Sequence, residues 1–329
     1  MDSESLQRET APVAVSGRSV LTRFLAPAVG SSSSVTRGGA AALAGLRVLA
    51  GLLWLYNVAW KQPPDFGESS GGGLYGYTSG AVDYPVFPPY SWVVEQVVLP
   101  NFTAFGWMVL VVETGLAVLL LTGTQVRLAA LVGVGQSLAI GLSVAQTPGE
   151  WPWAYWMMIG IHVVLLFTPS GRVAAVDSVR AEAADGRGPA AARRVLLGWG
   201  VLIAVSGVVA LVLAANDDPL TSTGSQLGGP DLSVSLGSYN VLGAALLVVV
   251  AALMLAASRG QRAAALAAAV VAGLAAVSLW VQLSRTDVWL GGSNTSAAFF
   301  CCAAVVSVAT AGQLSQQSTV EGATRHGAA

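Results

Sequence analysis

The segment FGWMVLVVETGLAVLLLTG, Phe105 to Gly123, decides the class of fold because it is apolar over the length of a membrane span. About 20 mostly apolar residues are enough for a transmembrane helix. One ionisable residue, Glu113, interrupts the segment near its middle. A charged side chain at the centre of a spanning helix costs roughly 3 kcal/mol on insertion scales. The fold must therefore provide a partner for this carboxylate.

The whole chain has the composition of an integral membrane protein. Of its 329 residues, 54% are hydrophobic and 10% are charged, whereas soluble domains average about 25% charged residues. The formal net charge of -1 predicts no nucleic-acid partner. Adjacent Cys301 and Cys302 fall in an apolar run, where we expect buried and unbridged thiols. No Cys/His cluster has zinc-site spacing, so we expect no metal.

Apolar runs of spanning length occur eight times, at 40–60, 102–121, 127–146, 153–168, 195–215, 238–257, 263–283 and 296–312. With a cytoplasmic N-terminus, all but three of the 16 Lys and Arg residues lie on the cytoplasmic side. The exceptions are Lys61, Arg285 and the embedded Arg47. This asymmetry is typical of plasma-membrane proteins. It predicts a multi-pass protein of the plasma membrane with both termini cytoplasmic.

These spans divide the chain into an all-α membrane protein with two four-helix bundles. We expect a disordered cytoplasmic tail at 1–38, a first bundle at 39–180, a cytoplasmic linker at 181–194, a second bundle at 195–313 and a cytoplasmic tail at 314–329. The turn TQVRLAALVG at 124–133 resembles GQRAAALAAA at 260–269, which suggests a parallel duplication. In the long outer loop from 62 to 100, SWVVEQVVLP has the pattern of a short interfacial helix.

Four polar side chains fall at similar depth when the helices of the first bundle are counted from their cytoplasmic ends at about 1.5 Å per residue. They are Arg47, Glu113, Gln136 and His162. Ionisable residues within a membrane usually face the bundle interior and pair. We therefore predict an Arg47–Glu113 ion pair, completed by Gln136 and His162. The alternative is a purely structural network that fixes helix register.

Further polar and aromatic residues share faces with this predicted network and are typical of a cleft. In the first span, Trp54, Asn57 and Lys61 follow Arg47 on one stripe. Tyr155 shares a face with His162 in the fourth span. The candidate ligand-binding residues are Trp54, Asn57, Lys61, Gln136 and Tyr155, and the candidate catalytic residues are Glu113, Arg47 and His162.

Three segments in order resemble the DoxX superfamily: GLRVLAGLLWLYNVAWK (45–61), VVETGLAVLLLTGTQVRLAAL (111–131) and WAYWMMIGIHVVLLFTPSGRVAAVD (153–177). They are most similar to its DoxD-like branch, named for the small subunit of thiosulfate:quinone oxidoreductase. The family's marks fall on Arg47, Asn57, Lys61, Glu113, Arg127, Gly171, Arg172 and Asp177. The resemblance covers residues 40–180. It implies a four-helix transmembrane bundle and, in the named branch, thiosulfate oxidation coupled to quinone reduction.

The resemblance and the polar residues together favour a membrane-embedded redox subunit that binds quinone. In this hypothesis Glu113 or His162 passes protons, and Arg47 stabilises the anion of the reduced headgroup beneath Trp54 and Tyr155. We expect no covalently bound cofactor, so a small donor or another redox subunit supplies the electrons. One alternative is a non-enzymatic membrane scaffold or accessory subunit of a larger complex. Another is a small-molecule transporter.

Overall fold

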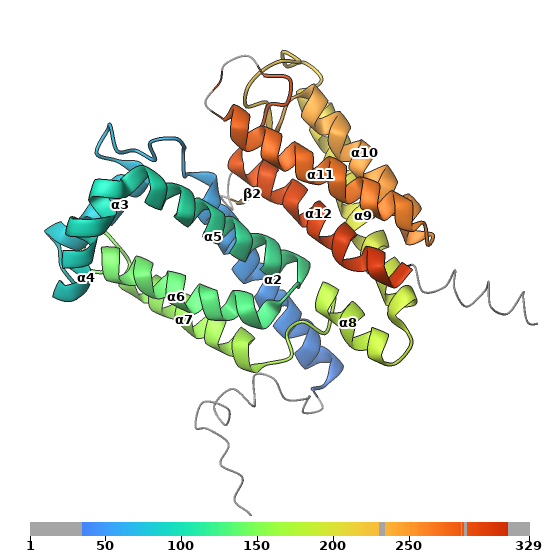
Figure 1. Ribbon diagram of the computed structural model, residues 1–329, viewed down its shortest axis with the longest axis horizontal. Helices are drawn as coiled ribbons and strands as arrows, with labels where there is room; N and C mark the ends of the chain where they lie inside the picture. Colours follow the sequence, from blue (N-terminus) through green and yellow to red (C-terminus); the bar gives the residue numbers. More distant parts are fainter. Residues whose placement is uncertain (1–34, 230–233, 284, 286–287, 315–329) are drawn as a thin grey trace, which may run out of the picture. The chain divides into compact units, whose positions relative to one another are not determined.

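The computed structural model describes residues 35–229, 234–283, 285 and 288–314 (Figure 1). The expected tails at 1–38 and 314–329 therefore lie almost wholly outside the described residues. The elements, labelled as in Figure 1, are α2 (Arg37–Ala59), α3 (Gly73–Asp83), α4 (Pro88–Val93), the π-helical turn η1 (Val94–Val98), the 3-10 turn η2 (Leu99–Asn101), α5 (Phe102–Thr122), α6 (Val126–Val144), α7 (Pro152–Phe167), α8 (Val176–Ala184), α9 (Gly188–Ala214), β1 (Ser225–Gly229), β2 (Val234–Tyr239), α10 (Val241–Ser258), α11 (Arg262–Gln282) and α12 (Asn294–Leu314).

The chain is a nearly all-α, multi-pass membrane protein. Seven helices in the described residues are long and apolar enough to cross a membrane. The expected run at 153–168, the fourth in order, forms α7, which has only 16 residues. A helix lies in each of the eight expected runs, so the pattern of apolar segments predicted the helices correctly. By length and composition seven of these helices are candidate spans, and α7 is a shorter apolar helix.

The segment that opens α5 differs from the expected short interfacial helix. The helix runs without a break from Pro88 to Thr122, through η1 and η2, over 35 residues. Pro100 has no amide hydrogen, and its ring needs room beside the preceding turn. The π-helical turn just before it widens the helix locally and gives the ring that room. The segment from 88 to 101 is therefore a direct extension of the apolar helix that carries Glu113.

Four helices of the first half contact one another in a closed order. α2 packs along α5 and contacts α7, while α6 contacts both α5 and α7. Figure 1 shows α6 and α7 side by side, with α3 near the C-terminal end of α6. The approach of α2 to α5 is close, because a Cβ added to Gly51 would lie 2.8 Å from Leu121 Cγ. This contact fixes the register of α2 along α5.

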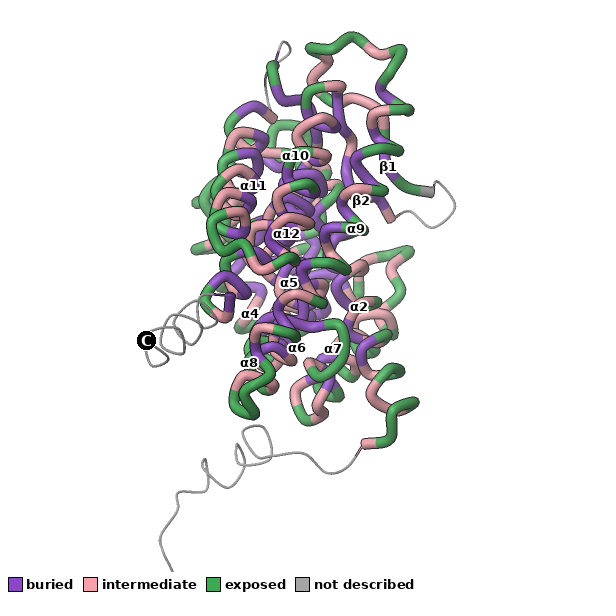
Figure 2. Tube along the Cα trace, turned by 90° about the vertical axis from the view of Figure 1, so that its right-hand side faces the viewer, coloured by how far each residue is buried: buried purple, intermediate pink, exposed green. Residues whose placement is uncertain are grey.

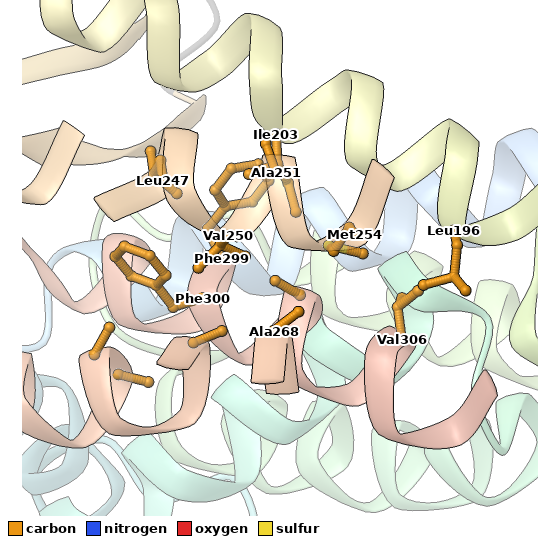
Figure 3. Packing of buried hydrophobic residues seen from close by; sticks show 14 of the residues in the cluster. Leu196, Ile203, Leu247, Val250, Ala251, Met254, Ala268, Phe299, Phe300 and Val306 are labelled. Carbon is orange, nitrogen blue, oxygen red and sulfur yellow. The ribbon is translucent and has the colours of Figure 1, made fainter. Parts of the chain in front are cut away.

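The second half repeats this neighbour order with α9, α10, α11 and α12, each of which contacts the next, and α12 also contacts α9. Its core is apolar, as Figure 3 shows for side chains from all four helices, including Ile203, Met254, Ala268 and Phe300. Among the spanning helices, α12 is the most enclosed (Figure 2). It also contacts α2 and α5 of the first half.

Two local elements were not expected from the sequence. β1 and β2 form an antiparallel hairpin between α9 and α10, with Ser225 paired to Tyr239. The run expected as a helix from 238 therefore begins as strand, and α10 starts at Val241, where Asn240 Oδ1 accepts a hydrogen bond of 2.8 Å from Gly243 N. The second difference lies at 181–194, where α8 and the start of α9 replace the expected linker.

Candidate functional site

The carboxylate of Glu113 forms an ion pair with Lys61 in the interior of the first half. Lys61 Nζ contacts Glu113 Oε2, and each side chain is 1% exposed. Gln136 Nε2 donates a hydrogen bond of 3.2 Å to the other carboxylate oxygen, Oε1. Lys61 Nζ also donates to Asn57 O at 2.9 Å and lies 4.0 Å from the ring centroid of Trp60. We call Lys61, Glu113 and Gln136 the Lys61–Glu113 cluster.

Lys61 reaches Glu113 because its side chain turns back along α2. The residue lies just beyond the last turn of the helix, yet its ammonium bonds the carbonyl of the residue one turn earlier. Glu113 and Gln136 come from facing positions of α5 and α6. A buried charge pair is stable only when further hydrogen bonds satisfy its remaining donors and acceptors. Asn57 and Gln136 supply those bonds here.

The predicted Arg47–Glu113 ion pair is wrong. Arg47 is fully buried, but its Nη2 donates to Ala174 O at 2.9 Å and to Val173 O at 3.3 Å. A Cβ added to Gly123 would lie 1.8 Å from Arg47 Nη1, so the guanidinium sits at the turn that ends α5. Glu113 lies ten residues before Gly123 on α5, which is about 15 Å along the helix from the turn that holds Arg47.

The error in depth arises at the start of α2. The depth of Arg47 in the sequence prediction is counted from residue 40, which is taken as the cytoplasmic end of the first span. The structure begins α2 at Arg37, and the part of α2 before Arg47 extends past the turn that follows α5. Arg47 is therefore a residue of the arginine-rich end of the bundle rather than of its middle. Its observed role is to hold the 173–174 loop.

His162 forms a second, separate contact with Trp54. The Trp54 indole N–H donates to His162 Nε2 at 2.9 Å, and the two rings meet edge-on with centroids 5.7 Å apart. An indole nitrogen can only donate, so Nε2 accepts and the ring proton is on Nδ1. That nitrogen lies 2.7 Å from Met158 O. Both ring nitrogens are thus occupied, and the ring packs on Gly133, where an added Cβ would lie 2.1 Å from His162 Cδ2.

The remaining predicted ligand-binding residues lie outside the Lys61–Glu113 cluster. Asn57 Nδ2 donates to Leu53 O at 3.0 Å within its own helix. The Tyr155 hydroxyl donates to the carboxylate of Glu150 in the loop before α7. The single network predicted from the sequence is therefore three separate contacts: Arg47 with the 173–174 loop, Trp54 with His162, and the Lys61–Glu113 cluster. Among these three, only the cluster joins three polar side chains.

Asn294, at the start of α12, is a residue that sequence reasoning did not assign to this site. Its Nδ2 donates to Lys61 O and, at 3.3 Å, to Val58 O. The side chain is 5% exposed. It therefore binds the carbonyls at the end of α2, next to the cluster. The sequence signal is a polar residue at the start of an apolar helix, but helix N-capping alone is enough to account for such a residue.

Buried charge is unevenly distributed between the two halves. Within the described residues, every buried Arg, Lys, Glu or His side chain lies between residues 47 and 162. The described part of the chain also contains no group of three or more His, Cys, Asp or Glu that could hold a metal ion. Cys301 and Cys302 are both free thiols. Within the described residues, chemistry that needs a buried Arg, Lys, Glu or His side chain therefore belongs to the first half.

A scan of protein-family models, a search of curated proteins and a search of solved structures all gave no match for this chain. The class that the fold and the site define is a helical, multi-pass membrane protein with a buried Lys–Glu pair in its first half.

Proposed function

We propose that the chain is a membrane-embedded subunit of a redox system and that the Lys61–Glu113 cluster binds the headgroup of a quinone. The observation that carries the proposal is a fully buried ion pair with an amide donor beside it. The resemblance of residues 40–180 to DoxD-like proteins points to the same chemistry. Reduction of a quinone takes up two electrons and two protons, so its site needs hydrogen-bond donors and a proton source.

The cluster offers both kinds of group. Lys61 Nζ and Gln136 Nε2 can donate to the quinone carbonyl oxygens, as they now donate to the Glu113 carboxylate. Glu113 can pass protons to the reduced headgroup once a quinone displaces one of its partners. The electrons come from a small donor of the thiosulfate type or from a partner subunit. Neither Arg47 nor His162 takes part in this revised site.

A second candidate function is a non-enzymatic scaffold or accessory subunit. It is favoured by the internal hydrogen bonds of Arg47 and His162, which are directed at a loop and at a neighbouring helix. Buried polar groups of this kind can fix the register of helices. In this candidate the Lys61–Glu113 cluster has the same structural role.

Bound quinone separates the two candidates. The protein is purified in native-lipid nanodiscs, and extracted quinone is quantified against protein. Wild type should retain stoichiometric quinone, and Lys61→Met/Glu113→Gln should lose it. Glu182→Gln, at an exposed ion pair on α8, is the matched control and should retain it. A wild-type protein that carries no quinone, even after quinone is supplied, would leave the scaffold as the function.

For the topology we propose eight spans in two similar four-helix bundles, with both termini cytoplasmic. The repeated neighbour order of the two halves supports the duplication. At 16 residues α7 is about 24 Å long, a little less than a hydrocarbon core of about 30 Å. Local thinning of the bilayer accommodates such a helix at modest cost. The arginine asymmetry supports the direction.

Thiol labelling of intact cells tests this topology. Ser69→Cys and Ala181→Cys place exposed thiols before α5 and on α8, in a background where Cys301 and Cys302 are Ala. An impermeant reagent should label the first position from outside and should reach the second only after permeabilisation. The reverse pattern would overturn the orientation. Labelling of both positions from one side would overturn the proposed number of spans between them.

A further inference from the structure

A cavity of about 460 Å³ opens on the arginine-rich side of the protein, away from the Lys61–Glu113 cluster. It lies between the 172–174 loop, α8 and the first half of α9. The carbonyls of Val173 and Ala174 in this loop are the groups that bind Arg47. The buried guanidinium therefore holds one wall of the cavity in place.

The polar part of the lining is basic. Arg172 and Arg194 both line the cavity and are exposed. Arg194 pairs with Glu182 at 2.7 Å, and Arg187 also reaches that carboxylate at 3.7 Å. Arg172 forms no ion pair with a described residue. The cations thus outnumber the single carboxylate, and the site has a net attraction for an anion.

The apolar part of the lining follows α9 into the membrane. Val195, Trp199 and Leu202 line the cavity at spacings of four and three residues, which places them on one helix face. From Arg194 to Leu202 this face descends about 12 Å. Gly198 lies on the same wall, and a Cβ added there would meet no atom within 4 Å. The wall is therefore open along a hydrophobic strip that begins at the arginines.

We propose that this cavity binds one anionic phospholipid of the adjacent leaflet. Arg172 and Arg194 donate hydrogen bonds to the headgroup phosphate, and one acyl chain lies along Val195, Trp199 and Leu202. Guanidinium groups match phosphate oxygens in geometry and charge. Basic pockets between helices on the cytoplasmic side are suited to such headgroups. A soluble phosphate would use only the arginines and would leave the apolar strip without a role.

Lipid retention in nanodiscs tests the proposal without reference to quinone. The full-length protein is placed in phosphatidylcholine discs that contain a minority of phosphatidylglycerol, and retained lipids are identified by native mass spectrometry. Wild type should retain one phosphatidylglycerol in preference to phosphatidylcholine. Arg172→Gln/Arg194→Gln should weaken that retention about tenfold or more, because two charge-assisted hydrogen bonds are lost.

One further variant, with two controls, separates the headgroup from the acyl chain. Gly198→Leu fills the apolar strip without a backbone clash and should weaken retention to a similar extent. Gly115→Leu on α5 also meets open space and serves as its control. Arg180→Gln on α8 lies outside the cavity lining and is the control for charge. Both controls should retain the lipid as wild type does.

Three results would overturn the proposal. One is equal retention of the two lipids by wild type. Another is wild-type retention by Arg172→Gln/Arg194→Gln, in which only exposed side chains change and folding is spared. The third is displacement of phosphatidylglycerol by inorganic phosphate together with normal retention by Gly198→Leu, which would assign the arginines to a soluble anion.

Discussion

The substitution Glu113→Gln removes the acidic partner of Lys61 and leaves Lys61 as a buried cation without a counter-ion. Lys61 and Glu113 are each 1% exposed, so water cannot replace the lost partner. Breaking a buried pair in this way costs about 3–5 kcal/mol. Glu113→Gln keeps an oxygen that can still accept from Gln136, so the loss is attributable to charge. We expect the unfolding equilibrium constant to rise by roughly two to four powers of ten.

Removal of both charges should restore most of this stability. In Lys61→Met/Glu113→Gln no charge is stranded, and replacement of a whole buried pair is often neutral. The assay is reversible unfolding in mixed micelles, followed by tryptophan fluorescence, for both single variants and the double variant. Glu182→Gln breaks the exposed pair with Arg194 and should cost less than about 1 kcal/mol.

Two outcomes would refute this reasoning. The first is a cost for Glu113→Gln no larger than that for Glu182→Gln, which would mean that the pair is not a buried ion pair. The second is a double variant as unstable as the two single variants combined, because a true pair must show a favourable coupling energy. Arg47→Met with Glu113→Gln should instead be additive, since their side chains bind different groups.

Three smaller perturbations test the packing around the site. Trp54→Phe removes the indole donor to His162 and should cost about 1 kcal/mol in unfolding free energy. Gly133→Ala forces a Cβ to within 2.1 Å of the imidazole and should cost about 1–3 kcal/mol, whereas Gly115→Ala meets open space and should cost nothing measurable. The Asp177 carboxylate accepts from the amides of Gln125 and Val126 at the start of α6, each at 3.0 Å. Asp177→Asn weakens these bonds and should lower the melting temperature measured by a thermal-shift assay.

The helices could be predicted from the sequence because each spanning run is apolar all round and bounded by polar or glycine-containing turns. The hairpin of β1 and β2 could not. Its strands are short and rich in Ser and Gly, so they carry little alternation of apolar and polar residues. Its position depends on contacts with α12, as where Ser296 Oγ donates to Ser238 O. Such contacts have no signature in the local sequence.

The partner of Glu113 could be narrowed to one stripe of α2 but not to one residue. Arg47 and Lys61 are fourteen residues apart and share that stripe, so helical periodicity cannot choose between them. The choice depends on how far α2 is shifted along α5. That shift is set by the contact of Gly51 with Leu121 and by the fit of Arg47 beside Gly123. Gln136 was placed correctly because α6 follows α5 after a short turn, which fixes their relative depth.

The amide of Asn294 has a consequence for how the chain can be divided. It completes the hydrogen bonding of carbonyls that end α2, and Ala298 and Cys302 of the same helix belong to the core of the first half. A fragment containing only residues 39–180 would expose those carbonyls and lose part of its interior. The two halves are therefore not independent modules. The last helix, α12, serves both of them as a shared structural element.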